Sequence, residues 1–328
     1  MKAIVCEKYG PPDVLQLRET PKPVPKENEA LVKIMAASLN AADLETLRGD
    51  FVTRMVAPLK PKHMIPGTDF AGQIEAIGSR VMQFKPGDEI WGDLSFPLDG
   101  GTLAEYVCIP EKALRLKPAS MTFEEAAAIP TAAVVALQKL RIKGPIRSGQ
   151  MVLINGAGGG VGTFAIQIAK YFGAEVTGVD STEKLDTLRA IGVDHVIDYT
   201  QEDFAQNRQH YDLILDIVVR RSFFDYRRVL NPQGICVMVG GSLRRVLTNK
   251  ILGSIFPNTG NKKMGLGKWN PNKKEDLDFL QELVEAGKLK PVIDRCYPLS
   301  EVPEAFRYLE AGHVRGKAVI TMEHSDKF

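Results

Sequence analysis

Apolar residues follow two different rhythms along this chain, and the rhythm changes near Thr122. The first part holds short apolar runs, "ALVKIMAAS" and "FAGQIEAIG", followed by the turn-containing "FKPGDEIWGD" and by "GGTLAEYVCIP". Short strands with many turns favour a small barrel-like β domain. One predicted helix, "NAADLETLRG", interrupts this domain and ends at Gly49.

After Thr122, apolar runs alternate with helical segments. The runs that predict strands are "MVLI", "AEVTGV", "DHVIDY", "YDLILDIVV" and "QGICVMVGG". The segments that predict helices between them are "GVGTFAIQIAKYFG", "TEKLDTLRAIG" and "RSFFDYRRVL". Continuous apolar strands joined by helices indicate an α/β fold with a doubly wound parallel sheet, covered on both faces.

The end of the chain adds one more helix and one more strand. "KKEDLDFLQELVEAGKLKP" predicts an amphipathic helix, because its leucines share one face, and "GKAVITM" predicts a final strand. We therefore expect a barrel-type domain over residues 1–122, a parallel-sheet domain over 123–266 and a C-terminal segment over 267–328.

Composition narrows the class of protein. The 328 residues are 44% hydrophobic and 25% charged, and the formal net charge of +2 gives no reason to expect a nucleic-acid partner. The N-terminus lacks an apolar run of signal-peptide length, and the most apolar stretch, "AAAIPTAAVVAL", is too short to span a bilayer. The four cysteines form no Cys-x-x-Cys pair. We expect a cytoplasmic protein with reduced thiols.

The segment "MVLINGAGGGVGTFAIQIAKYFGAEVTGVD" has the order strand, glycine loop, helix, strand, acid. This order predicts a dinucleotide-binding unit. Two registers fit, one with Gly156, Gly159 and Gly162, and one in which Ala157 takes the first position. Both place Gly159 where the backbone approaches a pyrophosphate. A tight turn without a ligand is the alternative. The predicted cofactor contacts are Gly158, Gly159, Gly160, Val161 and Gly162.

Asp180 ends the second strand of this unit, about 20 residues after the loop. A carboxylate at this position accepts hydrogen bonds from the adenosine ribose hydroxyls, which favours NAD. The sequence "DSTEK" also fits a helix cap. Both interpretations of Asp180 stay open.

The chain resembles the medium-chain dehydrogenase/reductase superfamily, in its zinc-free quinone oxidoreductase-like branch, over almost its whole length. The passages that carry the resemblance are "SLNAADLETLRG", "IPGTDFAGQIEAIG", "FKPGDEIWGD", "GGTLAEYV", "EEAAAIPTAAVVALQKL", "GAGGGVG" and "VIDYTQEDF". It implies a GroES-like catalytic domain, a Rossmann nucleotide-binding domain inserted into it, and a C-terminal segment, residues 267–328, that returns to the catalytic domain. Between the two domains it implies a cleft in which NADPH or NADH reduces quinones or enones. It also implies a homodimer.

The resemblance bears on zinc, because a related branch holds a catalytic zinc ion. The ligand positions of that branch match Asn40, Thr68 and Thr131 here. None of these is a good zinc ligand, and Asp69 is a single carboxylate. The five histidines are scattered. We expect no metal site.

Asn40 and Asp43 match positions that line the nicotinamide cleft in the zinc-free branch. The resemblance implies that Asn40 donates to the acceptor's carbonyl oxygen and that Asp43 orients it. A helix-capping role explains the same two residues without chemistry. Glu45 and Val135 stand where many relatives carry a tyrosine and a threonine, so the acid–base scheme of those relatives does not transfer directly.

The nucleotide preference rests on opposing residues. Lys184 and Tyr199 match residues that grip the ribose phosphate of NADPH, and Ser181 assists, whereas Asp180 opposes a phosphate. The resemblance favours NADPH, with NADH also usable. It further implies cofactor contacts from residues that follow later strands, namely Ile217, Gly240 and Gly241.

A second function fits one other segment. Residues 244–274 are basic and glycine-rich, and "LRRVLTNKILGSIF" is compatible with an anionic surface. This segment would suit a nucleotide-binding protein with little catalysis that attaches to a membrane or to partners. Its apolar face is short and no RNA-binding motif accompanies it. We therefore expect a small-molecule substrate, with neither nucleic acid nor membrane as a partner.

Overall fold

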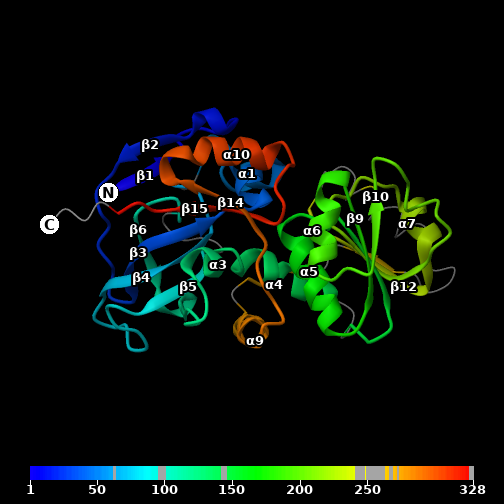
Figure 1. The fold of residues 1–328 in the computed structure, drawn as a ribbon. Helices are drawn as coiled ribbons and strands as arrows, with labels where there is room; N and C mark the ends of the chain where they lie inside the picture. The colour runs from blue at the N-terminus through cyan, green and yellow to red at the C-terminus, as the bar shows by residue number, and fades with distance from the viewer. Residues whose placement is uncertain are drawn as a thin grey trace. The chain divides into compact units, whose positions relative to one another are not determined.

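The computed structural model describes residues 1–61, 64–94, 101–141, 146–240, 248, 263–265, 269–271 and 273–324 (Figure 1). The chain forms two compact units. Unit 1 comprises Met1–Thr131, Pro271–Gln281 and Ile293–Phe328, and unit 2 comprises Ala132–Asn270 and Glu282–Val292. The first boundary follows Thr131, whereas the sequence pattern placed it at 122–123. Thr131 belongs to unit 1 because both its amide and its hydroxyl bind the Asp69 carboxylate.

Unit 1 is built on a seven-stranded sheet with the order β14-β15-β3-β4-β5-β7, in which β6 also pairs with β3. Most pairs are antiparallel, and β15 joins the last part of the chain to β3. A small second sheet pairs β1 with β2. The strands are β1 (Lys2–Val5), β2 (Gln16–Glu19), β3 (Glu29–Ser38), β4 (Asp69–Ile77), β5 (Glu89–Asp93), β6 (Tyr106–Pro110), β7 (Arg115–Leu116), β14 (Ile293–Pro298) and β15 (Lys317–Thr321).

The described helices of unit 1 lie between these strands in the chain. They are α1 (Ala41–Arg48), α2 (Phe51–Val56), α3 (Phe123–Ala127) and α10 (Val302–Glu310), with short 3-10 turns η1 (Pro12–Val14), η2 (Glu111–Ala113) and η4 (Leu299–Glu301). Helix α1 ends where the sequence predicts, because Gly49 adopts the left-handed conformation with φ 64°.

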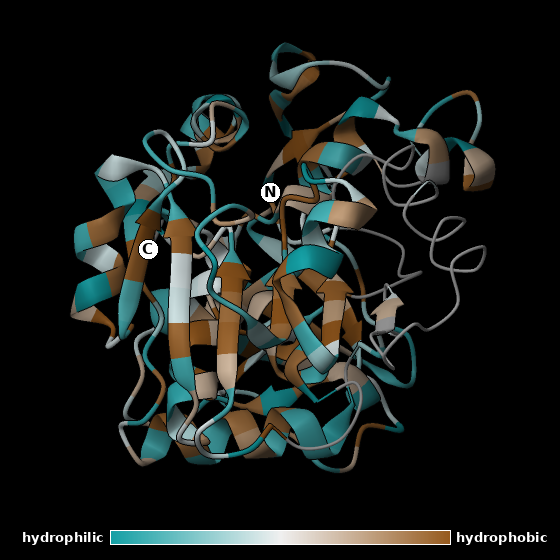
Figure 2. Ribbon diagram, turned by 90° about the vertical axis from the view of Figure 1, so that its right-hand side faces the viewer, coloured by the Kyte–Doolittle hydropathy of each residue, from teal (hydrophilic) through white to brown (hydrophobic). Residues whose placement is uncertain are grey.

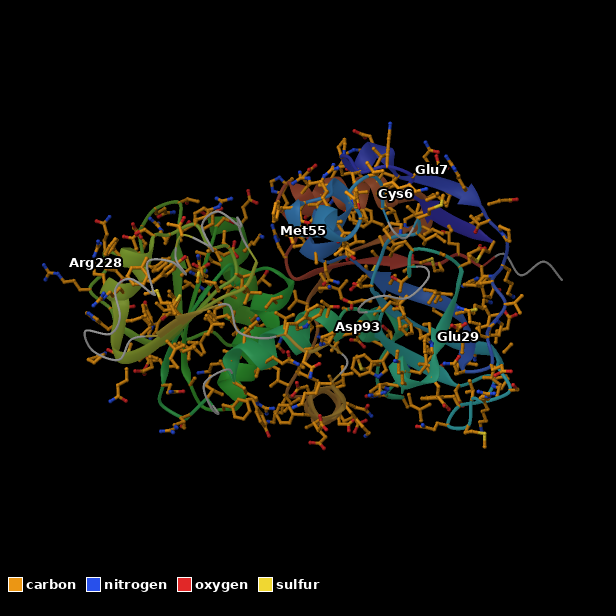
Figure 3. The ribbon with its side chains drawn as sticks, turned by 180° about the vertical axis from the view of Figure 1, so that it is seen from behind. Cys6, Glu7, Glu29, Met55, Asp93 and Arg228 are labelled. Atoms are coloured by element: carbon orange, nitrogen blue, oxygen red, sulfur yellow. The ribbon has the colours of Figure 1, made fainter. Side chains whose placement is uncertain are left out.

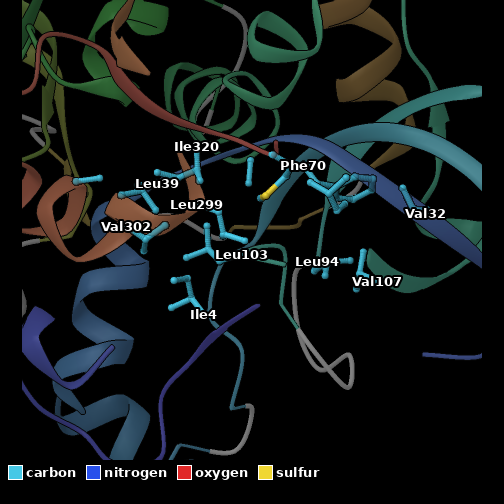
Figure 4. Packing of buried hydrophobic residues seen from close by; sticks show 14 of the residues in the cluster. Ile4, Val32, Leu39, Phe70, Leu94, Leu103, Val107, Leu299, Val302 and Ile320 are labelled. Atoms are coloured by element: carbon cyan, nitrogen blue, oxygen red, sulfur yellow. The ribbon is translucent and has the colours of Figure 1, made fainter. Parts of the chain in front are cut away.

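The core of unit 1 joins residues from both ends of the chain. Ile4, Val32 and Phe70 pack in one cluster with Leu299, Val302 and Ile320 (Figure 4). Each fully buried side chain of this size contributes about 1.5–3 kcal/mol. The C-terminal strand and helix are therefore part of the core of unit 1.

Unit 2 is built on a six-stranded sheet with the order β10-β9-β8-β11-β12-β13. All of its pairs are parallel, as the continuous apolar runs predict. Brown apolar residues dominate the strands in Figure 2, and teal residues dominate the connecting segments. The strands are β8 (Met151–Asn155), β9 (Glu175–Asp180), β10 (His195–Asp198), β11 (Tyr211–Asp216), β12 (Leu230–Met238) and β13 (Lys263–Gly265).

Helices alternate with the strands of unit 2, so the predicted doubly wound parallel arrangement is confirmed. They are α5 (Gly160–Tyr171), η3 (Thr182–Lys184), α6 (Leu185–Ala190) and α7 (Phe223–Val229). Helices α4 (Pro130–Leu140) and α9 (Lys274–Glu285) run across the sequence boundaries between the units. On α7, Arg228 projects outward (Figure 3), and its side chain is 58% exposed.

Candidate functional site

The carboxyl edge of the unit 2 sheet gathers most of the predicted cofactor residues. The glycine loop follows β8, Asp180 ends β9, Tyr199 follows β10 and Ile217 follows β11. Because the strand order reverses at β8, this edge is a topological switch point, where α/β sheets bind ligands.

Two glycines of the loop have different surroundings. A Cβ added at Gly162 would lie 2.4 Å from the Gly156 carbonyl oxygen, so α5 can approach the loop only because Gly162 has no side chain. A Cβ at Gly159 would meet only that same oxygen, at 3.6 Å, an ordinary contact. The chain's own packing therefore does not require a glycine at 159.

Gly159 is the N-cap of α5 and carries no side chain to bind the first amides of the helix. Those amides have no acceptor within the helix and they lie at the positive end of its dipole. The open space at Gly159 and the uncapped amides together form a cradle that fits a pyrophosphate.

Asp180 is bound to the glycine loop. Its Oδ2 accepts a hydrogen bond from the Gly158 amide at 2.7 Å, and its Oδ1 accepts one from the Ser181 amide at 2.9 Å. The side chain is only 9% exposed. The helix-cap interpretation does not describe this geometry, because Ser181, not Asp180, is the N-cap of η3.

The residues predicted to read the ribose lie around Asp180. Lys184 Nζ is 3.9 Å from Asp180 Oδ1, and the aliphatic part of Lys184 covers Gly158. The Tyr199 amide donates to the Asp180 carbonyl oxygen, and the Tyr199 residue is 51% exposed. Lys184 therefore lies beside both Asp180 and the glycine loop.

Ile217 and Gly240 lie next to each other at the same edge. Ile217 donates its amide to the Asn155 carbonyl oxygen, and a Cβ on Gly240 would lie 3.7 Å from the Ile217 carbonyl oxygen. Gly241, predicted as a further contact, lies outside the described residues, as do residues 244–247 and 249–262 of the basic segment.

Asp216, at the end of β11, is a buried residue that the sequence analysis missed. Its Oδ1 accepts hydrogen bonds from the Asn155 side chain and from the Val218 and Val219 amides, and the Tyr226 hydroxyl donates to its Oδ2. Val219 is held at φ 51°, which is rare for a β-branched residue. Asp216 therefore fixes the chain that follows β11, beside the glycine loop.

In unit 1, the Asp69 carboxylate is the centre of a polar cluster. Its Oδ1 accepts from the Thr131 hydroxyl at 2.6 Å and from the Thr131 amide at 3.1 Å. Its Oδ2 accepts from Ser38, Asn40 and Lys317, at 3.1, 2.9 and 3.4 Å. The carboxylate is fully buried, and Asp93, opposite it in the β4–β5 register, is also fully buried (Figure 3).

Asn40 and Asp43 meet at the start of α1. The Asn40 amide N–H donates to Asp43 Oδ2 at 2.8 Å, which is one half of the predicted capping arrangement. The Asn40 side chain also binds the cluster, since Nδ2 donates to Asp69 at 2.9 Å and to Thr68 at 3.3 Å. The geometry therefore contains features of both interpretations, a cap and a polar site.

Burial raises the pKa of Asp43 to about 7, and the nearby Asp69 carboxylate also raises it, although the Asn40 amide and Lys317 act in the opposite direction. The Thr68 hydroxyl lies 3.5 Å from Asp43 Oδ1. Asp43 is therefore an acid that changes protonation near neutral pH.

The three positions that match zinc ligands, Asn40, Thr68 and Thr131, all lie around Asp69. Among the residues that the structure describes, no group of three or more His, Cys, Asp or Glu side chains is arranged to hold a metal ion. Within the same described residues, no helix combines the length and the apolar character needed to cross a membrane.

Two protein-family patterns match the chain. The pattern described as "Alcohol dehydrogenase GroES-like domain" matches residues 26–119, and that described as "Zinc-binding dehydrogenase" matches residues 191–320. The first covers most of unit 1's sheet, which confirms the predicted GroES-like domain.

Similar proteins align over nearly the whole chain. The 2-methylene-furan-3-one reductase of Solanum lycopersicum is 39% identical over 98% of this chain and 79% of its own. The chloroplastic NADPH-dependent alkenal/one oxidoreductase of Arabidopsis thaliana is 35% identical, with the same coverage. The solved quinone oxidoreductase of Coxiella burnetii is 34% identical with a TM-score of 0.85, over 98% of this chain and 99% of that one.

Proposed function

The chain belongs to the medium-chain dehydrogenase/reductase superfamily, in its quinone oxidoreductase-like branch, and on that premise we propose that it is a zinc-independent NAD(P)H-dependent oxidoreductase. It transfers hydride to quinones or α,β-unsaturated carbonyl compounds. The observation that carries this function is the open, uncapped start of α5 at Gly159.

The bound nicotinamide supplies the hydride. The chain's own part is to hold the nucleotide: the first amides of α5 bind the pyrophosphate. Lys184 and Tyr199 hold a ribose phosphate, with Ser181 beside them. Both Asp180 oxygens already accept backbone amides, from Gly158 and Ser181, so each is partly used before any ribose hydroxyl arrives.

We assign Asn40 and Thr68 to the carbonyl side of the acceptor. Hydride addition to an enone or quinone moves negative charge onto the carbonyl oxygen, and a positioned N–H or O–H donor stabilises that charge. Asn40 Nδ2 has one long bond, to Thr68 at 3.3 Å, that it can exchange for the acceptor oxygen. Asp43 acts behind these residues by fixing the start of α1.

We place NADPH first among the nucleotides. The printed name of the Arabidopsis relative specifies NADPH, and Lys184, whose aliphatic part covers Gly158 and whose Nζ lies 3.9 Å from Asp180, supports a phosphate contact. The absence of zinc and a homodimer complete the proposal as predictions from the family resemblance. A location in the cytoplasm stays a prediction from the sequence composition.

The test is a panel of quinones, enals and enones, each assayed with NADPH and with NADH by following nucleotide oxidation. We expect turnover of at least one acceptor class and faster reaction with NADPH. An ordinary saturated ketone is the matched control, because it lacks the conjugated double bond. Reduction of the saturated ketone alone would contradict the assigned acceptor class.

A further inference from the structure

Lys317 is a buried cation in unit 1 that the sequence analysis did not select. Its side chain is 2% exposed, and its Nζ donates to Asn40 Oδ1 at 2.6 Å and to Asp69 Oδ2 at 3.4 Å. The strand register explains this position. Val319 of β15 pairs with Ser38 of β3, and Leu39 donates to the Ala318 carbonyl oxygen, so the first residue of β15 lies beside Asn40.

A buried ammonium is costly. Its effective desolvation penalty is several kcal/mol. A protein in which well-packed apolar side chains replace a buried ion pair is often as stable as the parent, or more stable. Burial correspondingly lowers the pKa of Lys317, although Asp69 and Asp43 oppose this. Stability alone therefore does not account for a lysine at this position.

Lys317 determines how the Asn40 amide is turned. An ammonium only donates hydrogen bonds, so the Asn40 atom that faces it must be the oxygen. The other end, Nδ2, must then face Asp69 and Thr68. Without the lysine, only Asp69 would oppose a turn of the amide that presents its oxygen to the acceptor, where it would repel a developing negative charge.

We propose that Lys317 is a positioning residue for acceptor reduction, acting through Asn40. Its ammonium holds the Asn40 amide with Nδ2 as the donor. By binding Oδ1, it also polarises the amide so that Nδ2 becomes a stronger donor. The benefit grows as charge develops on the acceptor oxygen, so it appears mainly in the transition state. This inference rests on the role proposed above for Asn40.

Lys317 places a positive charge in the cluster in which the three positions that match zinc ligands carry Asn40, Thr68 and Thr131. The Asp69 carboxylate, 3.4 Å from the Lys317 ammonium, carries the opposite charge. The Asn40 amide passes the polarising effect of the ammonium from its Oδ1 to its Nδ2. The cation thus acts one side chain away from the reacting oxygen and does not touch the substrate.

The first experiment compares Lys317→Met with Lys317→Arg. The methionine removes the charge and keeps much of the volume, whereas the arginine keeps a buried donor. Lys117→Met is the matched control, because Lys117 is also in unit 1, its side chain is 5% exposed and its Nζ pairs with Glu89 at 3.0 Å. Measurements are kcat and KM with the best acceptor, the Kd for NADPH, and the thermal midpoint.

We expect Lys317→Met to lower kcat by roughly ten- to a hundredfold. The Kd for NADPH should change less than about twofold, because the nucleotide residues lie in unit 2. Lys317→Arg should recover most of the lost kcat, and Lys117→Met should keep the parental value. Parental kcat in a folded Lys317→Met variant, or no recovery with arginine, would overturn the proposal.

A double-mutant cycle separates action through Asn40 from a general packing effect. In an Asn40→Ala background, Lys317→Met should cost little more, since the amide that it positions is gone. Fully additive losses would overturn the proposal. If Lys317→Met does not fold, Lys317→Gln takes its place in the cycle, because glutamine keeps a donor without the charge.

The parent protein is assayed first. If the parent reduces no quinone or enone with either nucleotide, the proposed function has failed. If the parent is active and the lysine variants match it, only the role of Lys317 has failed.

Discussion

Gly159 and Gly162 stand three residues apart in one loop but meet different surroundings. At Gly162 a side chain would collide with backbone atoms of Gly156 and Ala157. At Gly159 it would enter open space. The fold therefore requires Gly162 to lack a side chain, whereas the space at Gly159 is available to a ligand.

We expect Gly159→Val to fold like the parent and to lose NADPH affinity by on the order of a hundredfold or more, because valine fills the phosphate cradle. Gly162→Val should instead lower the thermal midpoint strongly. Calorimetric titration and thermal unfolding of both variants separate the two effects. Parental NADPH binding by Gly159→Val would show that the loop does not hold the pyrophosphate.

Asp180 and Lys184 oppose each other at the ribose position. Asp180→Asn removes the charge and keeps an oxygen for the Gly158 amide, so NADPH binding should tighten several-fold while NADH binding weakens. Lys184→Ala should weaken NADPH binding and leave NADH nearly unchanged. A several-fold change in Kd corresponds to on the order of 1 kcal/mol for each effect. An unchanged NADPH-to-NADH ratio of Kd values in both variants would contradict this assignment.

Helices α1 and α7 begin with similar capping boxes, but the pKa values of the acids in these boxes shift in opposite directions. Burial raises the pKa of Asp43 in α1 to about 7. For Asp225 in α7, burial also raises the pKa, but hydrogen bonds from Ser222 outweigh it and lower the pKa below its ordinary value. The difference arises from the surroundings of each helix, not from the box.

The sign of the pH dependence follows from these directions. Between pH 3.8 and about 7, folded Asp43 holds its proton and the unfolded chain releases it. The free energy of unfolding therefore falls as pH rises, by on the order of 1 kcal/mol per pH unit. Asp43→Asn should remove this slope while keeping an acceptor oxygen for the Asn40 amide.

Asp225→Asn is the matched control, with the opposite expectation. Because the pKa of Asp225 is lowered in the folded protein, its carboxylate stabilises the fold at pH values above the ordinary pKa of an aspartate. This contribution is lost as the pH falls below about 4. The asparagine variant should therefore be less stable than the parent at neutral pH and should approach it in acid. Urea unfolding from pH 3 to 8 gives both curves. Parallel curves for the parent and Asp43→Asn would contradict the raised pKa.

For the whole molecule, the name of the matching family pattern and the residues of the site give different indications about a zinc ion. Residues 191–320 match a pattern described as "Zinc-binding dehydrogenase", yet the positions expected to hold the catalytic ion carry Asn40, Thr68 and Thr131. Their side chains bind Asp69 or, for Thr68, lie beside Asn40. Membership of the family therefore does not decide the metal.

We expect far less than one zinc ion per chain after dialysis, and unchanged turnover after treatment with a strong chelator. Elemental mass spectrometry and the acceptor assay measure these two quantities. A zinc-dependent alcohol dehydrogenase treated in parallel should lose its activity. One tightly held ion per chain, with activity lost on its removal, would contradict the assignment.

Much of unit 2 was predictable because its signals are local. The run Met151–Asn155, the glycine loop and the helix that follows are neighbours in sequence, and each obeys a short-range rule of periodicity or glycine conformation. Asp180 at the end of β9 was predicted for the same reason, whereas Lys184, one turn later, was predicted only from the family resemblance. The short strands of unit 1, such as β7, and the left-handed Val219 gave no comparable signal.

Periodicity and glycine content act over a few residues, so the β-rich part, the parallel α/β part, the order of their elements and the glycine loop could all be predicted from the amino-acid pattern. The polar cluster around Asp69 could not, because it forms only through contacts between distant parts of the chain. Lys317 and Asn40 are 277 residues apart in the chain, and Asp69 and Thr131 are 62 apart. Lys317, Asn40 and Asp69 meet because β15 pairs with β3 and β3 pairs with β4 in one particular register, and Thr131 joins them from the start of α4. No local pattern encodes such a register, and a lysine at the start of a strand resembles any solvated lysine until the neighbouring strands cover it.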